Sequence, residues 1–368
     1  MSAPLSYAEY RRQRYFAPLD GTRAVAVLLV AFVHARGDWH RLAGWNGVTI
    51  FFVLSGYLIT TLALREESRA GGLDRASFYV RRCFRILPLY LVALLLFLGV
   101  DLVAGLATGQ AQQRLLDALP FYLSPLPEFP HFFGRGGPFE IAWSLGIEEK
   151  FYLLWPLLAF GVPGLRGRFG RRLALTALLF AAAEAAPLAG GAGWALAPYG
   201  SILAGCTLAL LLHQPHWFRR TGVLARPLPF TGVVAVLGCL QVLTAIEPRA
   251  LQAAYSVTVA AAIAGVVLGA PGATRALATR PLRFVGRISY GLYLVHPLGL
   301  SAAAAIVPAE LGGLGNALAL LLGMVLAIAL ATVLHHTVEQ PLIALGRSIA
   351  ARRPAGDPLR TAPAAAHP

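Results

Sequence analysis

Residues 20–38 read DGTRAVAVLLVAFVHARGD, and the fold class follows from this stretch. Ten apolar residues run without interruption between Arg23 and His34, and Asp20 adds a carboxylate one turn earlier. The run has the composition of a helix in hydrocarbon, where about 20 mostly apolar residues make one crossing. Ionisable groups are costly inside a membrane, so those that flank the run are candidate functional residues.

Helical geometry relates these polar groups to one another. Arg23 and His34 are eleven residues apart, which is about 1,100° of rotation, so they lie on the same face roughly 16 Å apart along the axis. Asp20 is positioned to pair with Arg23, and Asp38 continues the line about one turn beyond His34. Snorkelling toward the two membrane surfaces explains each residue taken alone. The shared face favours a polar pathway through a helix bundle.

The rest of the chain repeats the apolar pattern. Of the 368 residues, 57% are hydrophobic and 13% are charged, whereas soluble domains carry about 25% charged residues. The sequence therefore predicts an all-α polytopic membrane protein with about ten transmembrane helices. The candidate spans are 19–36, 47–64, 86–107, 144–162, 173–190, 195–212, 229–246, 251–269, 288–307 and 315–336.

The distribution of arginine predicts the orientation. With the N-terminus inside, 24 arginines fall in inside segments and 5 in outside loops, which predicts cytoplasmic termini and an even number of spans. The net charge of +14 therefore indicates membrane topology and not nucleic-acid binding. We expect a cytoplasmic segment over 1–18, a membrane domain over 19–346 and a disordered cytoplasmic tail over 347–368. The three cysteines lack metal-ligand spacing, and no metal is predicted.

Further charged residues lie in or beside the later spans. Arg82 and Arg85 share one helix face, and spacing alone favours positive-inside anchoring over a phosphate site. Glu148 and Glu149 point about 100° apart, so one is expected to reach Lys150 or the surface while the other faces the bundle. A buried carboxylate there could act as a general acid or base, orient a histidine, or pair with an inner arginine.

Three other positions have weaker signals. Ser55 lies beside Gly56, which favours a helix-packing interface first and a substrate groove second. His296, in the ninth span, is more readily explained as a hydrogen-bonded bundle residue than as a direct catalyst. Glu339 ends the tenth span, just before Pro341.

Six motifs in order carry a family resemblance. LDGTRAVAVLLVAFVH, GVTIFFVLSGYLIT, RRCFRILPLY, WSLGIEEKFYLLWP, LRFVGRISYGLYLVHP and VEQP resemble the acyltransferase family 3 membrane proteins over residues 15–345. The resemblance implies a ten-span O-acyltransferase of the bacterial inner membrane. Such a protein takes an acyl group, commonly acetyl, from acyl-CoA. The implied acceptor is a hydroxyl of a glycan, a lipid-linked sugar or a small metabolite.

The resemblance also implies roles for particular residues. Arg23 and His34 match the family's Arg–His pair of the first span, and Arg82 and Arg85 match its paired cytoplasmic arginines. That match raises the phosphate interpretation of Arg82 and Arg85 above anchoring. The Trp-Ser-Leu-x-x-Glu motif selects Glu148 over Glu149. This motif corresponds to Trp143, Ser144, Leu145 and Glu148. The family's late histidine and glutamate match His296 and Glu339.

Two positions depart from the family pattern. Thr22 replaces the common leucine after Asp-Gly, and Thr49 replaces a frequent acid in the second span. If that acid contributes to acceptor binding, the acceptor of this protein is expected to differ.

The implied mechanism places the chemistry at His34. Arg82 and Arg85 are expected to hold the phosphates of acyl-CoA, with Arg23 along the path of the donor. His34 acts either as a general base on the acceptor hydroxyl or as a transient acyl carrier. Glu148 orients it or relays its proton, and Asp20, Ser55 and Trp143 are expected to support the site. A lipid-linked glycan transporter without acyl transfer is the rival function.

Overall fold

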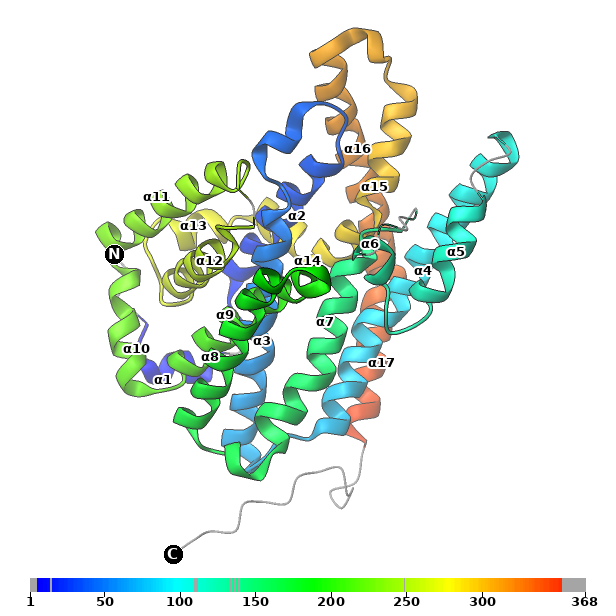
Figure 1. Ribbon diagram of the computed structural model, residues 1–368. Coiled ribbons are helices and arrows are strands. Elements are labelled where there is room, and N and C mark those ends of the chain that lie inside the picture. The colour runs from blue at the N-terminus through cyan, green and yellow to red at the C-terminus, as the bar shows by residue number, and fades with distance from the viewer. Residues whose placement is uncertain are drawn as a thin grey trace, which may run out of the picture. The chain divides into compact units, whose positions relative to one another are not determined.

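The described residues fold into helices connected by short turns. The computed structural model describes residues 5–13, 15–108, 112–132, 134, 137, 139–247 and 249–352, and these contain helices and no strand (Figure 1). The helices are α1 (Tyr7–Arg12), α2 (Ala17–His34), α3 (Asn46–Ala70), α4 (Arg75–Thr108), α5 (Gln112–Tyr122), α6 (Phe129–Phe132), α7 (Ala142–Trp155), α8 (Phe169–Ala185), α9 (Ala197–Leu212), α10 (Pro215–Thr221), α11 (Pro227–Leu243), α12 (Gln252–Val267), α13 (Ala273–Leu277), α14 (Arg280–Arg287), α15 (Ser289–Ile306), α16 (Gly312–Leu334) and α17 (Gln340–Ala351). The all-α prediction is confirmed.

Six helical segments of the described chain are long and apolar enough to cross a membrane. They are Ala17–His34, Asn46–Ala70, Arg75–Val103, Phe169–Ala189, Gly193–Leu212 and Ala309–Ala351. The pair Pro215–Ala225 and Pro227–Leu243, bent by 77°, makes a seventh if it is one span. A multi-pass protein is therefore supported, whereas the count of about ten and the cytoplasmic termini stay predictions.

Three of the expected spans form helices outside that set. Segment 144–162 overlaps α7, and segments 251–269 and 288–307 contain α12 and α15. Of these, α12 is an apolar helix of only 16 residues. A helix of 16 residues is about 24 Å long, which is less than the roughly 30 Å of a bilayer core. Apolar composition predicted these helices correctly, but it does not fix where each one ends.

The described chain divides into two compact units. Unit 1 lies within residues 1–65 and 167–328, and unit 2 within 66–166 and 329–368. The expected boundaries of the membrane domain, 19–346, stay a prediction. Residues 353–368 of the expected tail lie outside the described residues.

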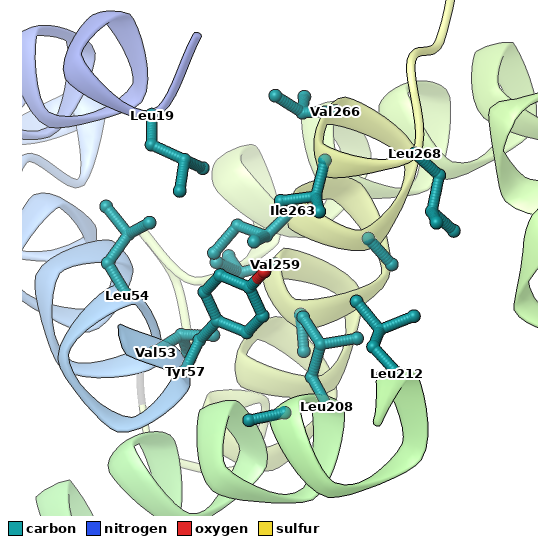
Figure 2. Packing of buried hydrophobic residues seen from close by; sticks show 14 of the residues in the cluster. Leu19, Val53, Leu54, Tyr57, Leu208, Leu212, Val259, Ile263, Val266 and Leu268 are labelled. Carbon is teal, nitrogen blue, oxygen red and sulfur yellow. The ribbon is translucent and has the colours of Figure 1, made fainter. Parts of the chain in front are cut away.

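The core of unit 1 is built by α2, α3, α9 and α12. Figure 2 shows Tyr57 of α3 among Val259 and Ile263 of α12 and Leu208 of α9. Tyr57 is fully buried, and the aliphatic residues around it are nearly so. In a membrane bundle this close packing itself stabilises helix association, because lipid is as apolar as the side chains.

Two glycines let α3 and α9 approach until their backbones touch. A Cβ on Gly56 would lie 1.8 Å from the carbonyl oxygen of Ile202, and one on Gly205 would lie 2.0 Å from that of Val53. No larger residue fits either position without separating the helices. The packing interpretation of Gly56 is therefore consistent with the structure.

The N-terminal segment is docked onto unit 1. Tyr10 of α1 is fully buried, and the hydroxyl of Tyr7 donates to the carbonyl oxygen of His213 at 2.6 Å. The Tyr10 hydroxyl also contacts Nδ1 of His213 at 3.4 Å. Burial lowers the pKa of His213, which follows the last residue of α9, from 6.5 to about 3. These contacts fasten the N-terminal segment to the end of α9.

Unit 2 is organised around α4 and α17. Ser77 donates to the carbonyl oxygen of Ala350 at 3.2 Å, and Gly346 packs against Phe84, so the two helices run antiparallel. The Tyr79 hydroxyl donates to the carbonyl oxygen of Leu153, which fastens α7 to the same helix. Two π-helical turns interrupt the regular helices, at Pro156–Gly161 and at His335–Glu339.

Candidate active site

A single unbroken helix, α2, carries both ends of the expected polar stripe. Arg23 and His34 lie on α2 eleven residues apart, as the sequence predicted. The expected continuation through Asp38 is wrong, because α2 ends at His34. Ala35 is extended and Gly37 has a φ of +113°, so the chain turns off the helix axis before Asp38. Asp38 instead lies 3.9 Å from Arg41, and both side chains are exposed.

His34 meets a second histidine from α15. Nε2 of His296 lies 3.1 Å from Nδ1 of His34, and the two rings meet edge to face with centroids 4.8 Å apart. His296 is fully buried, whereas His34 at the end of α2 is exposed. The exposed imidazole of His34 therefore lies against the buried imidazole of His296.

Backbone carbonyls assign the protons of this pair. Nδ1 of His296 lies 2.7 Å from the carbonyl oxygen of Tyr293, and a carbonyl only accepts, so this nitrogen carries the proton. Nε2 of neutral His296 is then an acceptor for the Nδ1–H of His34, which also faces the carbonyl oxygen of Val30 at 3.1 Å. The lone pair of neutral His34 is therefore on its Nε2.

The other end of α2 carries a buried carboxylate. Asp20 is 5% exposed, and it accepts hydrogen bonds from the hydroxyl of Tyr15 and from Arg23, the latter at 3.4 Å. The expected pairing of Asp20 with Arg23 is present. Burial and the neighbouring Asp20 raise the pKa of Tyr15, so its hydroxyl stays protonated as a donor.

A small pocket opens between the start of α2 and the end of α3. Its volume is about 110 Å³, and it is lined by Tyr15, Phe16, Leu19, Asp20, Arg23, Tyr57, Leu58, Thr61, Leu62 and Arg65. Arg65 is 7% exposed and donates to the carbonyl oxygens of Gln13 and Tyr10 at 2.7 and 2.9 Å. From the sequence, Arg65 was counted only as an arginine of an inside segment, because a residue count does not reveal burial.

In unit 2, Arg82 and Glu148 share one tyrosine. The guanidinium of Arg82 lies 4.7 Å above the ring centre of Tyr152, and the Tyr152 hydroxyl donates to Glu148 at 3.1 Å. Glu148 and Arg82 therefore contact the same side chain, Tyr152. Arg85 is half-buried on α4 one turn later.

Lys150 pairs with a carboxylate other than Glu148 and Glu149. Its ammonium group pairs with Glu128 at 2.7 Å and donates to the carbonyl oxygens of Pro125 and Gly146. Glu149 keeps a buried carboxylate oxygen without a hydrogen-bond partner among the described residues. The Glu128 contact joins positions 22 residues apart, and no local spacing rule predicts it.

The other residues predicted from the sequence are Trp143, Glu339 and Ser55. Trp143 stacks on His131 with ring centres 4.9 Å apart, and Glu339 lies 2.7 Å from Nδ1 of His335 within the second π-helical turn. Ser55 is half-buried on α3. Unit 1 thus brings Asp20 to Arg23 near the start of α2 and His34 to His296 at its end. Unit 2 brings together Arg82 and Glu148.

Comparison with known proteins gives consistent matches. A family model described as an acyltransferase domain, Acyl_transf_3, matches residues 16–336. The chain is 31% identical over 375 residues to a Bacillus subtilis (strain 168) protein named "Putative peptidoglycan O-acetyltransferase YrhL", an alignment covering 94% of this chain and 58% of that protein. It is 29% identical over 315 residues to the peptidoglycan O-acetyltransferase OatA of Listeria monocytogenes serovar 1/2a (strain ATCC BAA-679 / EGD-e), covering 77% of this chain and 49% of OatA.

The matches differ in how much of each protein they cover. The chain spans about half the length of the curated relatives that it matches. No solved structure matches it. The family model, in contrast, covers most of the 368 residues, including α2 and α15 with their histidine pair. The chain belongs to the Acyl_transf_3 family of acyltransferase domains.

Proposed function

We propose that this chain is a membrane O-acyltransferase of the bacterial cell membrane, which moves an acyl group, acetyl in the simplest case, from acyl-CoA to a hydroxyl of a cell-envelope glycan. Family membership supports the reaction class, and two relatives with peptidoglycan O-acetyltransferase in their names support a glycan acceptor. The observation that carries the chemistry is the contact between exposed His34 and buried His296.

The proposed transfer uses His34 as a general base. Nε2 of His34 takes the proton of the acceptor hydroxyl while the hydroxyl oxygen bonds to the carbonyl carbon of the thioester. The carbon–sulfur bond breaks, and the protonated His34 returns the proton to the leaving thiolate, which departs as a thiol. Imidazole suits both steps because its unperturbed titration lies near neutral pH.

His296 has an orienting role in this proposal. Its acceptor nitrogen holds the Nδ1–H of His34 and so keeps Nε2 of His34 as the basic nitrogen. A buried third group that fixes a catalytic histidine follows the logic of hydrolase triads, with a neutral imidazole in place of the carboxylate. The alternative, a covalent acyl group on Nε2 of His34, uses the same tautomer.

Two arginine pairs are candidates for the anionic part of the donor. Arg23 and Arg65 line the pocket of unit 1, and Arg82 and Arg85 lie on α4 in unit 2. Guanidinium groups match phosphate oxygens in a forked geometry, which suits either pair to a phosphate-bearing thioester. Arg65 was not among the donor-binding residues expected from the sequence.

Labelled donor tests the function directly. Inverted membrane vesicles that contain the protein are incubated with radiolabelled acetyl-CoA, and label in glycan, lipid and protein is counted. We expect His34→Ala to lower transfer by about 10²–10⁴-fold, the usual contribution of a general base. His216→Ala makes the same change at an exposed position on α10 and should leave transfer unchanged.

Two outcomes would contradict the proposal. Full transfer by His34→Ala at equal membrane abundance would remove His34 from the chemistry. Absence of acetyl transfer by the unmutated protein, together with movement of a lipid-linked glycan across the vesicle membrane, would favour the transporter. Label that stays on the protein, and that His34→Ala abolishes, would identify the acyl-histidine route.

A further inference from the structure

The chain that leaves α2 is fastened to the end of α15 by one arginine. Nε of Arg36 donates to the side-chain oxygen of Asn316 at 2.9 Å. Its two terminal nitrogens donate to the carbonyl oxygens of Ala304, Val307 and Pro308 at 3.4, 3.1 and 3.4 Å. One guanidinium therefore connects three chain segments: the exit of α2, the C-terminal end of α15 and the N-terminal part of α16.

The chemistry of this contact suits arginine in particular. The last carbonyls of a helix have no intrahelical partner, and the C-terminal end of the helix dipole favours a cation. The fork of a guanidinium reaches several such oxygens at once, whereas an ammonium is a compact point charge. Arg36 thus caps α15 through a side chain that belongs to another element.

The same contact joins the two segments that carry the histidine pair. Arg36 is two residues after His34, and Ala304 is eight residues after His296 on α15. His34 is the last residue of α2, and Ala35 after it is already extended. The final turn of α2 would fray readily without an outside attachment, because helix ends lack half of their hydrogen bonds.

Gly37 gives a second observation on this junction. It adopts a φ of +113°, and a Cβ there would lie 2.8 Å from the side-chain nitrogen of Asn316. The turn after His34 therefore packs directly on the residue that accepts from Arg36. Backbone shape and side-chain hydrogen bonds both fix the exit of α2 against α16.

We propose that Arg36 is a positioning residue for acyl transfer, which holds the last turn of α2 against α15 and so keeps Nδ1 of His34 in register with Nε2 of His296. The proposal rests on the proposed function of His34. It differs from surface anchoring, in which Arg36 would supply only a positive charge near the membrane boundary.

A double-mutant cycle distinguishes positioning from general stabilisation. The variants are Arg36→Gln, His296→Ala and the two combined, assayed as the rate at saturating radiolabelled acetyl-CoA per molecule of protein in inverted vesicles. A displacement of about 1 Å at a reacting group costs roughly 10²-fold, which is the fall expected for Arg36→Gln in the unmutated background. In the His296→Ala background the same substitution should cost less than about threefold, because residues that act through one contact are not additive.

Matched variants keep the test interpretable. Arg41→Gln removes the same charge from the same segment, at a side chain that is 77% exposed, and should leave the rate unchanged. Arg36→Lys keeps the charge without the fork and should resemble Arg36→Gln. If Arg36→Gln does not accumulate in the membrane, Asn316→Leu removes the acceptor of Nε and replaces it in the cycle.

The outcomes separate this inference from the proposed function. Equal losses for Arg36→Gln in both backgrounds, or full activity of Arg36→Lys, would overturn positioning and leave His34 catalysis intact. Full activity of His34→Ala would overturn the proposed function itself. Positioning requires two results together. The losses from Arg36→Gln and His296→Ala are strongly non-additive, and Arg36→Lys lowers the rate as much as Arg36→Gln does.

Discussion

At the scale of single residues, the direction of the His34–His296 hydrogen bond is set by a backbone carbonyl. The carbonyl oxygen of Tyr293 can only accept, so it places the proton of His296 on Nδ1, and Nε2 of His296 in turn places the proton of His34 on its Nδ1. A change at His296 should therefore alter how well His34 takes a proton, although His296 itself is buried.

Substitution of His296 tests that dependence. His296→Ala should lower the maximal transfer rate by about 10–100-fold, the usual effect of removing a partner that orients a reacting ligand, with little change in KM for acetyl-CoA. His296→Gln retains a side-chain acceptor and should keep more of the rate. Steady-state rates over a range of acetyl-CoA concentrations separate the two constants, and a rise in KM alone would contradict an orienting role.

Residue contacts also show where prediction from sequence stops. The shared face of Arg23 and His34 followed from helical periodicity alone, because both lie on one helix. The partners of His34 and Lys150 did not, because His296 and Glu128 are brought there by packing between elements. Asp38 was misplaced because periodicity was extended across Ala35 and Gly37, where the backbone leaves the helix.

At the scale of elements, the contact between α3 and α9 depends on two glycines, Gly56 and Gly205. Gly56 and Gly205 each face a carbonyl oxygen of the other helix at a distance that no Cβ tolerates. The apolar runs predicted both helices, and small residues suggested that α3 packs closely. Sequence alone did not identify α9 as its partner, since many helices of this chain offer small residues.

An alanine at this contact should be more costly than one elsewhere. Gly56→Ala is expected to destabilise the protein by about 1–3 kcal/mol through overpacking, and to lower the thermal unfolding temperature in detergent. Gly99→Ala on α4 meets nothing within 4 Å and should be neutral or slightly stabilising, because alanine is the better helix former. Equal unfolding temperatures for the two variants would argue against the close approach of α3 and α9.

At the scale of the whole molecule, the two ends of α2 are held by segments distant in sequence. The N-terminal segment reaches α9 through Tyr7, Tyr10 and His213, and α15 and α16 hold the opposite end through Arg36. The described N-terminal residues are therefore part of the fold of unit 1. Hydropathy predicted the membrane class, but it has no signal for such docking, because these contacts are made by aromatic and polar groups.

The docking of the N-terminal segment should depend on pH. His213 stays neutral in the folded protein down to about pH 3, whereas the unfolded chain protonates it near pH 6.5. Unfolding takes up a proton between these values, so stability falls as pH decreases below 6.5, by about 1.4 kcal/mol per pH unit for this group. Unfolding temperatures of detergent-solubilised protein, measured across this range, should show the decline.

A comparison of two histidine variants isolates the contribution. His213→Gln cannot titrate and should show a flatter dependence of unfolding temperature on pH. His216→Gln, at an exposed position on α10, should follow the unmutated protein. Identical profiles for all three proteins would mean that His213 does not couple folding to protonation.

Because α2 is one unbroken helix, the number of residues between Arg23 and His34 sets both their separation and their relative rotation. Each residue inserted or deleted between Arg23 and His34 would change their separation by about 1.5 Å and their relative rotation by about 100°. Eleven steps come within about 20° of three full turns, and neither ten nor twelve comes as close. The ten apolar positions should thus tolerate exchange among alanine, valine and leucine while tolerating almost no change in number. In this segment selection is expected to act on the count of residues more strictly than on their identity.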